Sequence, residues 1–424
     1  MNFDSILLFE NDLRDNFYPF SIMHPVWELR TGALRIFEKY QKEFPDKRLL
    51  FHGPELKTKS FLERFEIEDL EIKKENILVI NGAIIPYKEF WEGMKKKYRD
   101  FCREQGDEKS VVFSFMTFPI AALILAKDQI NVGNKDKSFL PRILNDFRGA
   151  IDQIELDEAR GLGWIWDALD NVESGTKDDF RHFENHYDFD KSPATFINKE
   201  KIKIGNDTNI APGVVIDASE GPVIIGDNCQ IMAQATLIGP CSVGDNSLIK
   251  VGAKIYENTA IGGVCKVGGE VENSIIQSYS NKQHDGFLGH SILSEWVNLG
   301  ADTNTSDLKN TYGDIRVQIE RRKMNSGRMF LGLLCGDHSK SGINTMYTTG
   351  TIAGVCGLHI GGGFLPKYMN SFTWGGAEDS ELYDIDKALE VADKVMQRRG
   401  KTLTEAEREL LQEEFKRTKI MLKK

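Results

Sequence analysis

One glycine-punctuated run, residues 284–310, concentrates histidine, carboxylate and asparagine side chains where the preceding sequence is mostly small and aliphatic. Histidine is the side chain best suited to proton transfer near neutral pH, so the first histidine of the run, His284, could take a proton from a reacting group. The run therefore predicts a functional site built on a structural scaffold. His284 could also be a coil residue whose ring is satisfied by backbone carbonyls. His290, His338 and His359 are more typical of structural histidines, and His338 in GDHSKSG is the better second candidate.

The scaffold that must position this run is a six-residue repeat. The repeat predicts a parallel β-helix with three short strands per coil and one aliphatic side chain per strand pointing inward. Glycine, asparagine and aspartate suit the corners, where tight turns or positive φ are needed. Ordinary sandwich strands would not hold this phase. The aliphatic residues fall at positions 204, 210 and 216 and then at 225, 231, 237, 243, 249, 255, 261 and 267. The period returns, weaker, at Ile275, Phe287, Leu293, Leu299, Leu334, Met346, Ile352 and Leu358.

The segment before the repeat alternates strand-like and helix-like stretches, which predicts a layered α/β domain. Short aliphatic runs at 5–10 and 76–82 are typical of buried parallel strands. Helices are predicted at 33–44, 87–102 and 118–128.

Two further helices are predicted after the repeat, at 386–400 and 402–424, the second opening on a capping box of Thr404 and Glu407. We therefore predict an α/β domain at 1–195, a β-helix at 196–366 and a helical tail at 367–424.

Bulk composition narrows the class of protein. A formal net charge of −10 over 424 residues disfavours nucleic acid as a partner. No apolar run reaches the roughly 20 residues that a bilayer span requires. The six cysteines are scattered without a CxxC pair, which indicates free thiols in a reducing compartment. These features predict a soluble, cytoplasmic protein without a membrane or nucleic-acid partner.

An α/β domain followed by a hexapeptide β-helix resembles the sugar-1-phosphate nucleotidyltransferases that carry acyltransferase trunks. The run 284–310 carries the closest likeness, to the bifunctional UDP-N-acetylglucosamine diphosphorylase / glucosamine-1-phosphate N-acetyltransferases. His284 stands at the position of that family's catalytic histidine, with FLG at 287–289 and NLGADT at 298–303 following without a gap. The resemblance implies a Rossmann-like nucleotidyltransferase head and a left-handed parallel β-helix trunk.

The same resemblance assigns roles in the trunk. His284 would be the base that deprotonates a sugar amine before it attacks the acetyl-CoA thioester. Phe287, Asn298 and Asp307 fall at substrate-contacting positions, and Lys250 falls where the family has a phosphate-contacting arginine.

The chain also departs from the family pattern in the trunk. Phe287 replaces a tyrosine, and Asp307 replaces an asparagine that touches the acetyl donor. Glu272 and Gly313 stand where lysines contact the sugar, and Ile343 where a serine contacts coenzyme A.

In the head the family's glycine-rich phosphate loop is missing. Arg14 follows the first strand, and Arg30, Thr31 and Gly32 come directly before the helix predicted from Ala33. A helix N-terminus with a cation beside it is a serviceable phosphate site. Arg30 could also be an ion-paired surface residue.

The family's magnesium-binding aspartate is missing from the head as well. Ala83 occupies its position, preceded by Asn81 as a candidate nucleotide contact. An alanine cannot ligate Mg²⁺, so Asp167 is the candidate replacement, although it could be an ordinary acid at a helix start.

The resemblance thus implies a homotrimeric transferase using a sugar 1-phosphate, UTP or another nucleoside triphosphate with Mg²⁺, and acetyl-CoA. Its product would be a nucleotide sugar like UDP-N-acetylglucosamine. Two alternatives stay open: an acyltransferase active only in its trunk, and a non-catalytic sugar-nucleotide-binding scaffold.

Overall fold

The computed structural model describes residues 1–10, 12–129 and 151–423, with the side chains of 12–14 excepted. The chain divides into two compact units. The first contains residues 1–16, 24–29 and 35–163, and the second contains 17–23, 30–34 and 164–424. The three-part division predicted above stays a prediction, and each unit is described by itself.

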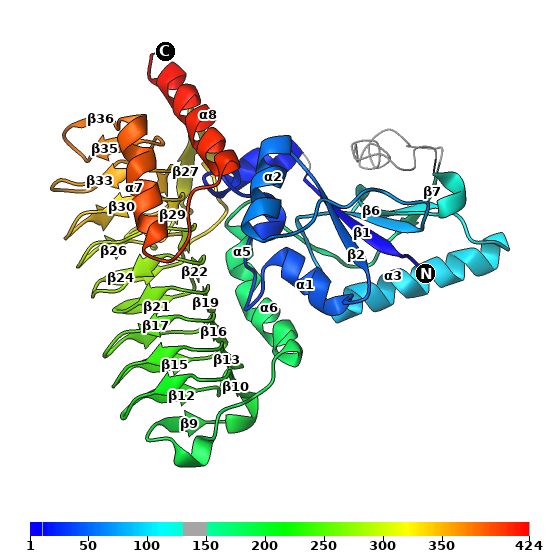
Figure 1. The fold of residues 1–424 in the computed structure, drawn as a ribbon, viewed down its shortest axis with the longest axis horizontal. Coiled ribbons are helices and arrows are strands. Elements are labelled where there is room, and N and C mark those ends of the chain that lie inside the picture. Colours follow the sequence, from blue (N-terminus) through cyan, green and yellow to red (C-terminus); the bar gives the residue numbers. More distant parts are fainter. Residues whose placement is uncertain (11, 130–150, 424) are drawn as a thin grey trace. The chain divides into compact units, whose positions relative to one another are not determined.

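The first unit is built on a six-stranded sheet with the order β2-β1-β3-β6-β5-β7. The predicted strands are confirmed as β1 (Ser5–Phe9) and β3 (Ile77–Asn81), which pair in parallel. The other strands are β2 (Arg48–His52), β5 (Val111–Phe115), β6 (Phe118–Ile124) and β7 (Asp152–Glu155), and a short pair is formed by β4 (Ile84–Ile85) and β8 (Arg160–Gly161). The α-helices of its described part are α1 (Ile36–Glu43), α2 (Glu55–Arg64) and α3 (Lys88–Gln105), the last running along the sheet in Figure 1.

The helix predicted at 118–128 is wrong. Most of that stretch is β6, which lies antiparallel to both β3 and β5 in the interior of the sheet. Its last five residues are buried. A strand covered on both faces reads as an unbroken apolar run, which the sequence pattern does not distinguish from a buried helix.

The second unit contains the predicted parallel β-helix, whose coils stack one on another in Figure 1. Strands of successive coils pair in parallel, as where Ile231 faces Ile249. All eleven aliphatic positions from Ile204 to Val267 in the predicted six-residue phase are buried in one core cluster. The repeat prediction is confirmed there.

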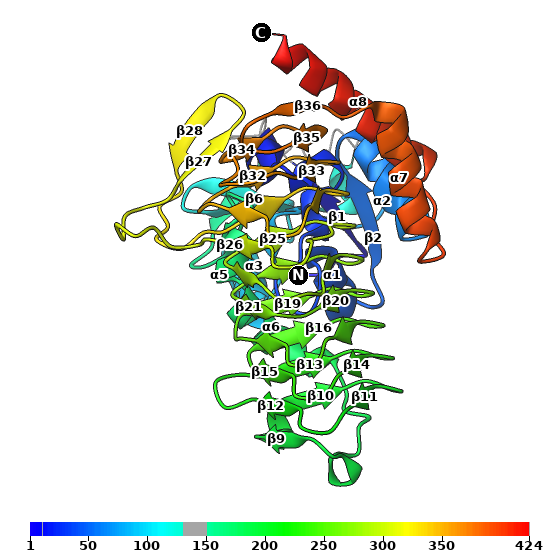
Figure 2. The same cartoon turned by 90° about the vertical axis from the view of Figure 1, so that its left-hand side faces the viewer.

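Three faces make the prism. Figure 2 shows β13, β16 and β19 of the first face stacked above one another. That face contains β10 (Ile202–Ile204), β13 (Val223–Ile225), β16 (Cys241–Val243), β19 (Thr259–Ile261), β22 (Ile275–Ile276), β25 (Ile292–Leu293), β29 (Leu334–Cys335), β32 (Ile352–Ala353) and β34 (Tyr368–Met369). The second contains β11 (Asn209–Ile210), β14 (Gln230–Ile231), β17 (Leu248–Ile249), β20 (Lys266–Val267) and β23 (Asn281–Lys282), and its upper coils add β30 (Lys340–Ser341), β33 (Leu358–His359), β35 (Thr373–Gly375) and β36 (Ser380–Leu382). The third contains β9 (Thr195–Ile197), β12 (Val215–Asp217), β15 (Thr236–Ile238), β18 (Lys254–Ile255), β21 (Glu270–Glu272) and β24 (Phe287–Gly289), and continues as β26 (Asn304–Thr305) and β31 (Met346–Tyr347).

In the upper coils, most predicted positions of the weaker repeat are out of phase by a single residue. The prism core contains Ile276, Leu288, Cys335, Tyr347 and Ala353, each of which directly follows a predicted position. Met346 is 37% exposed, and the neighbouring Tyr347 is buried in the core instead. Likewise His359 is buried where the pattern predicts Leu358. Polar side chains occupy inward positions in these coils, so the aliphatic residues beside them give a misleading phase.

An excursion between β26 and β29 carries an antiparallel hairpin of β27 (Arg316–Ile319) and β28 (Arg322–Asn325). Short helices precede the trunk, namely α5 (Asp167–Asp170) and α6 (Val172–Asp179). The two helices predicted after the repeat are confirmed as α7 (Ile385–Gln397) and α8 (Glu405–Leu422). Among the described residues, no helix is both long and apolar enough to cross a membrane.

The predicted capping box opens α8. The Glu407 amide donates to the Thr404 hydroxyl at 3.2 Å, and the Thr404 amide donates to the Glu407 carboxylate at 2.8 Å. We expect Thr404→Ala to weaken the helix start by about 1 kcal/mol, seen as roughly fivefold faster hydrogen exchange of the α8 amides. Thr402→Ala changes an exposed threonine outside the box and should leave exchange unchanged. Equal exchange in both variants would show that the cap adds nothing.

Candidate functional site

The strand β24 has a histidine near each end, His284 before it and His290 directly after it. The His284 side chain is exposed, and no hydrogen bond to its ring is formed within the described part of the chain. Its backbone, in contrast, is anchored from inside the prism, because the Lys282 amine donates to the His284 carbonyl oxygen at 2.6 Å. The result is a fixed backbone that presents a free imidazole to solvent, as a general base requires.

Lys282 occupies an inward position that carries an aliphatic residue in lower coils. Its side chain is 2% exposed, and burial lowers the pKa of its amine to about 8. Gly269, with φ of +71°, makes room for this contact. A Cβ there would lie 2.7 Å from the lysine nitrogen and 2.8 Å from the His284 oxygen. The inward lysine thus positions the corner that bears His284.

The other histidine, His290, sits in a cluster with two carboxylates. Its Nδ1 lies 2.8 Å from Oδ2 of Asp307. Each of the three residues offers one potential ligand atom, and these atoms lie within 4.8 Å of one another in Glu272, His290 and Asp307. The ring also stacks on Phe330, with ring centroids 5.0 Å apart. Burial, followed by the nearby Asp307 charge, raises the pKa of Glu272. Imidazole and carboxylate groups converge here on a half-buried surface.

A glycine leaves space at the centre of this surface. A Cβ on Gly289 would lie 2.4 Å from Asp307 Oδ2 and 2.5 Å from the Phe287 ring. The Phe287 amide is held by the Asn304 side-chain oxygen at 2.9 Å. The structure therefore brings together two of the predicted contact residues, Phe287 and Asp307, beside His290.

The other two predicted trunk contacts lie on the second face. Lys250 follows β17, and its amide donates to the Val267 carbonyl at 2.8 Å. The backbone of Asn298 bridges Asn281 and Lys340 of the adjacent coils. Both side chains are half-buried. Within the described residues, neither side chain is hydrogen-bonded to His284, so their roles stay predictions.

The remaining trunk histidines have structural settings. The His338 ring lies parallel to Trp296, which stacks on Tyr279 with centroids 4.2 Å apart, so His338 continues an aromatic column along one edge. Nδ1 of His359 is 2.9 Å from the Tyr347 hydroxyl inside the prism, and burial lowers the pKa of His359 to about 4.

In the first unit, the carboxyl ends of the parallel strands β1, β2 and β3 form the edge where open α/β sheets bind ligands. That edge is covered by the chain itself. The buried ring of Trp27 would lie 2.8 Å from a Cβ on Gly82, directly after β3, and 3.3 Å from one on Gly53, directly after β2. Its ring also packs on Phe51 and Phe61, with centroids 5.5 and 5.7 Å away.

Buried ion pairs hold this covering segment, residues 24–29. The Glu10 carboxylate accepts the Val26 amide at 3.1 Å and pairs with the Lys57 amine at 2.8 Å. Glu28 pairs with His24 at 3.0 Å and with Arg64. Burial alone would raise the pKa of Glu28, but the Arg64 and His24 charges outweigh it and lower the pKa to about 2.

The segment that the sequence predicts to bind phosphate in the head does not lie at a helix N-terminus. Helix α1 begins at Ile36 rather than near Ala33, so the Arg30-Thr31-Gly32 segment does not lie at its N-terminus. That segment belongs to the second unit, where a Cβ on Gly32 would lie 2.5 Å from the Gly175 backbone of α6. Arg30 is 4% exposed and donates to the Ala33 carbonyl. The predicted helix start is wrong because α1 begins only after the chain has packed on α6.

Of the other predicted head residues, Asn81 and Asp167 have side chains with local hydrogen-bond partners. Arg14 lies in the 3-10 helix η1 (Asp12–Phe17), and its side chain falls outside the described part of the chain. The Asn81 side-chain oxygen accepts the Ala83 amide at 2.9 Å. In the second unit, the Asp167 carboxylate accepts the Trp164 amide at 2.8 Å and lies 3.3 Å from the Arg328 guanidinium.

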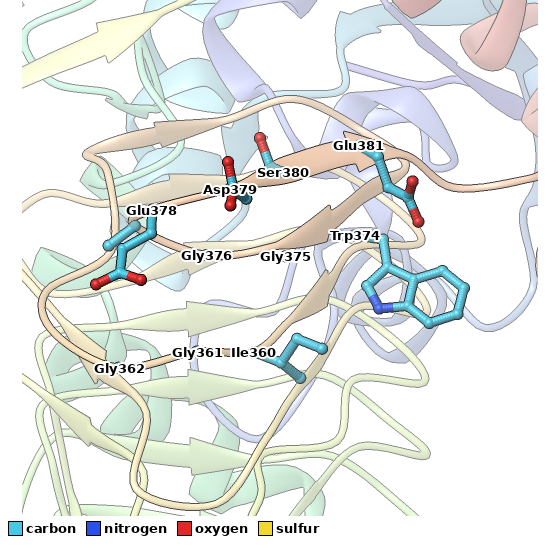
Figure 3. A pocket seen from close by; sticks show the side chains of 11 residues that line it. Ile360, Gly361, Gly362, Trp374, Gly375, Gly376, Glu378, Asp379, Ser380 and Glu381 are labelled. Carbon is cyan, nitrogen blue, oxygen red and sulfur yellow. The ribbon is translucent and has the colours of Figure 1, made fainter.

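The structure contains two cavities that the sequence did not predict. One, of 880 Å³, lies between the end of β2 and α2 and is lined by acids (Glu55, Glu63, Glu66 and Asp69) with Lys59 as a lining cation. The other, of 410 Å³, lies at the last coils of the trunk. Figure 3 shows Trp374 and Glu381 on one side of it and Glu378 by the loop at the other end.

Comparison with known proteins agrees with this architecture. Residues 6–186 match the family of sugar nucleotidyl transferases, and residues 222–257 match six bacterial transferase hexapeptide repeats. The resemblance inferred from the sequence is confirmed at that level: the chain carries a sugar nucleotidyltransferase domain followed by hexapeptide repeats.

Curated relatives have modest identity. A bifunctional sugar-1-phosphate nucleotidylyltransferase/acetyltransferase of Sulfurisphaera tokodaii is 26% identical over 54% of this chain and 59% of its own length. The bifunctional protein GlmU of Rippkaea orientalis is 32% identical over 25% of this chain and 23% of its own. The chain thus spans less than two thirds of either relative. A solved UDP-N-acetylglucosamine acyltransferase of Bacteroides fragilis aligns over 52% of this chain and 94% of its own, at 16% identity and a TM-score of 0.26.

Proposed function

We propose that this protein is a transferase that joins two reactions, nucleotidyl transfer to a sugar 1-phosphate and acetyl transfer from acetyl-CoA to an amino-sugar. The product would be a nucleotide sugar like UDP-N-acetylglucosamine. The observation that carries the proposal is the order of parts in one chain: a sugar nucleotidyltransferase domain, then a hexapeptide β-helix that presents an exposed histidine.

For acetyl transfer, the His284 imidazole would accept a proton from the sugar amine, whose lone pair then attacks the thioester carbonyl carbon. The C–S bond breaks as the amide forms, and coenzyme A leaves as the thiol after taking a proton. Phe287 and Asp307, which meet beside β24, would contact the substrates, Asp307 on the side of the acetyl donor. Asn298 and Lys250 are proposed to contact the sugar and its phosphate.

For nucleotidyl transfer, UTP or another nucleoside triphosphate would react with the sugar 1-phosphate. Mg²⁺ is the metal that this chemistry implies, but the two residues expected near it do not fit an ion. The Asn81 oxygen is held by a backbone amide, and Asp167 accepts the Trp164 amide beside Arg328. Arg14, Arg30, Thr31 and Gly32 remain the proposed phosphate contacts.

A second candidate is an acetyl-CoA-dependent acyltransferase active only in its trunk, with a head that binds a sugar nucleotide or serves as scaffold. Trp27 favours it, since this ring covers the sheet edge where a nucleotide would otherwise bind. The acidic lining of the cavity beside β2 is also unsuited to a triphosphate.

We propose a cytoplasmic homotrimer, since the flat faces of a β-helix are suited to closed cyclic packing. Light scattering at micromolar concentration should give three times the chain mass. A monomer would contradict the assembly.

Two assays test the function. Pyrophosphate release from UTP with a sugar 1-phosphate reports the head, and thiol release from acetyl-CoA with glucosamine 1-phosphate reports the trunk. Both activities support the main proposal, and thiol release alone supports the second candidate. If neither product forms, both proposals are wrong.

A further inference from the structure

The corner of the β-helix that follows β24 collects three potential metal ligands on neighbouring coils. Glu272 ends β21, His290 follows β24, and Asp307 lies two residues beyond β26. Strands in successive coils are about 4.8 Å apart, so side chains in one column can reach a common point. One ligand atom from each residue lies within 4.8 Å of the other two.

The distances within this cluster suit a single ion. Nδ1 of His290 and Oδ2 of Asp307 are 2.8 Å apart, so an ion about 2.1 Å from each could be bound by both. The Glu272 carboxylate has no hydrogen-bond or ion-pair partner among the described residues. Gly289 keeps the space beside Asp307 open, because a side chain there would collide with the carboxylate.

Charge in the cluster also favours a cation. Two carboxylates approach each other on a half-buried surface, and the side chains of His290 and Asp307 are only 21% and 12% exposed. Phe330 stacks on the imidazole, with the ring centroids 5.0 Å apart.

We propose that Glu272, His290 and Asp307 form a binding site for a first-row divalent transition metal ion such as Zn²⁺. A donor set of one imidazole nitrogen and two carboxylate oxygens suits Zn²⁺ or Co²⁺, whereas Mg²⁺ prefers an all-oxygen octahedral shell. The ion would tie the start of the 308–330 excursion, through Asp307, to the two coils below it. The site shares Asp307 with the proposed acetyl-transfer site, but Zn²⁺ binding can be measured without any transferase activity.

The test uses the full-length protein after treatment with a chelator and gel filtration. Equilibrium dialysis with Zn²⁺, followed by metal analysis, should find one ion per chain, and Co²⁺ should bind with a visible absorption band. Zn²⁺ should also raise the melting temperature of the wild type, because a ligand that binds only the folded state stabilises it. Mg²⁺ at the same concentration should do neither.

Substitutions test whether the ion binds to this cluster of three residues. His290→Ala should lower Zn²⁺ affinity at least tenfold, and Glu272→Gln, a near-isosteric change that should not disturb folding, should do the same. His186→Ala removes an exposed histidine elsewhere in the second unit and should leave affinity unchanged. No stoichiometric Zn²⁺ binding, or equal affinity in wild type and Glu272→Gln, would overturn the proposal. Neither result would affect the acetyl-transfer assay, so failure of the metal site and failure of the proposed function can be told apart.

Discussion

His284→Ala is expected to lower the rate of acetyl transfer by about 10² to 10⁴-fold, because a neutral base must remove a proton before the sugar amine can attack. Folding should be unaffected. The side chain is exposed, so its loss leaves no cavity, and the expected change in unfolding free energy is within about 0.5 kcal/mol. Thiol release from acetyl-CoA in the presence of glucosamine 1-phosphate measures the rate.

His186→Ala is the matched control, because it removes another exposed histidine of the second unit. It should keep the wild-type rate. If His284→Ala turned over as fast as this control in an active enzyme, the base would lie elsewhere, and His290 with its Asp307 partner would be the next candidate. If His284→Ala lowered the melting temperature of the trunk, the histidine would be structural.

Trp27→Ala is expected to destabilise the head by about 3–5 kcal/mol, the usual effect of deleting a fully buried aromatic side chain. The ring is 0% exposed and packs against Phe51, Phe61 and the backbone positions of Gly53 and Gly82. Urea unfolding followed by hydrogen exchange of the β1 and β3 amides would locate the loss in the first unit.

Phe118→Ala serves as its control, since Phe118 is an aromatic residue of the same unit that is 70% exposed. Its replacement should change the unfolding free energy by no more than about 0.5 kcal/mol. A Trp27→Ala protein as stable as this control would show that the segment 24–29 is loosely held. The edge of the sheet would then be open to a nucleotide, and the case for the second candidate function would weaken.

The fold was predictable where one physical pattern dominates. Between Ile204 and Val267 all eleven side chains on the predicted six-residue phase lie in the buried core, because each must fill the same narrow prism. The phase was lost higher in the trunk, where Tyr347 and His359 take inward positions and the neighbouring Met346 and Leu358 look like the core residues. The stretch 118–128 failed for a related reason, since a strand buried on both faces carries no alternation.

The candidate site was predictable only through local sequence likeness, which singled out His284, Phe287 and Asp307. The partnership of His290 with Asp307 was missed, although a signal existed. His290 and Asp307 are separated by the same number of residues as Leu288 and Thr305. Leu288 and Thr305 are both buried and occupy inward positions one coil apart. Counting that coil places the two side chains one above the other. The role of Trp27 had no comparable signal, because it depends on glycines after two strands distant in sequence.

The proposed function requires that one chain both acetylates an amino-sugar and attaches a nucleotide to it. Mass spectrometry of the products tests this directly, after the purified protein is incubated with acetyl-CoA, glucosamine 1-phosphate, UTP and Mg²⁺. We expect a single nucleotide sugar that carries the acetyl group, formed by the wild type and not by His284→Ala. Recovery of unchanged substrates from the wild-type reaction would contradict the proposed function.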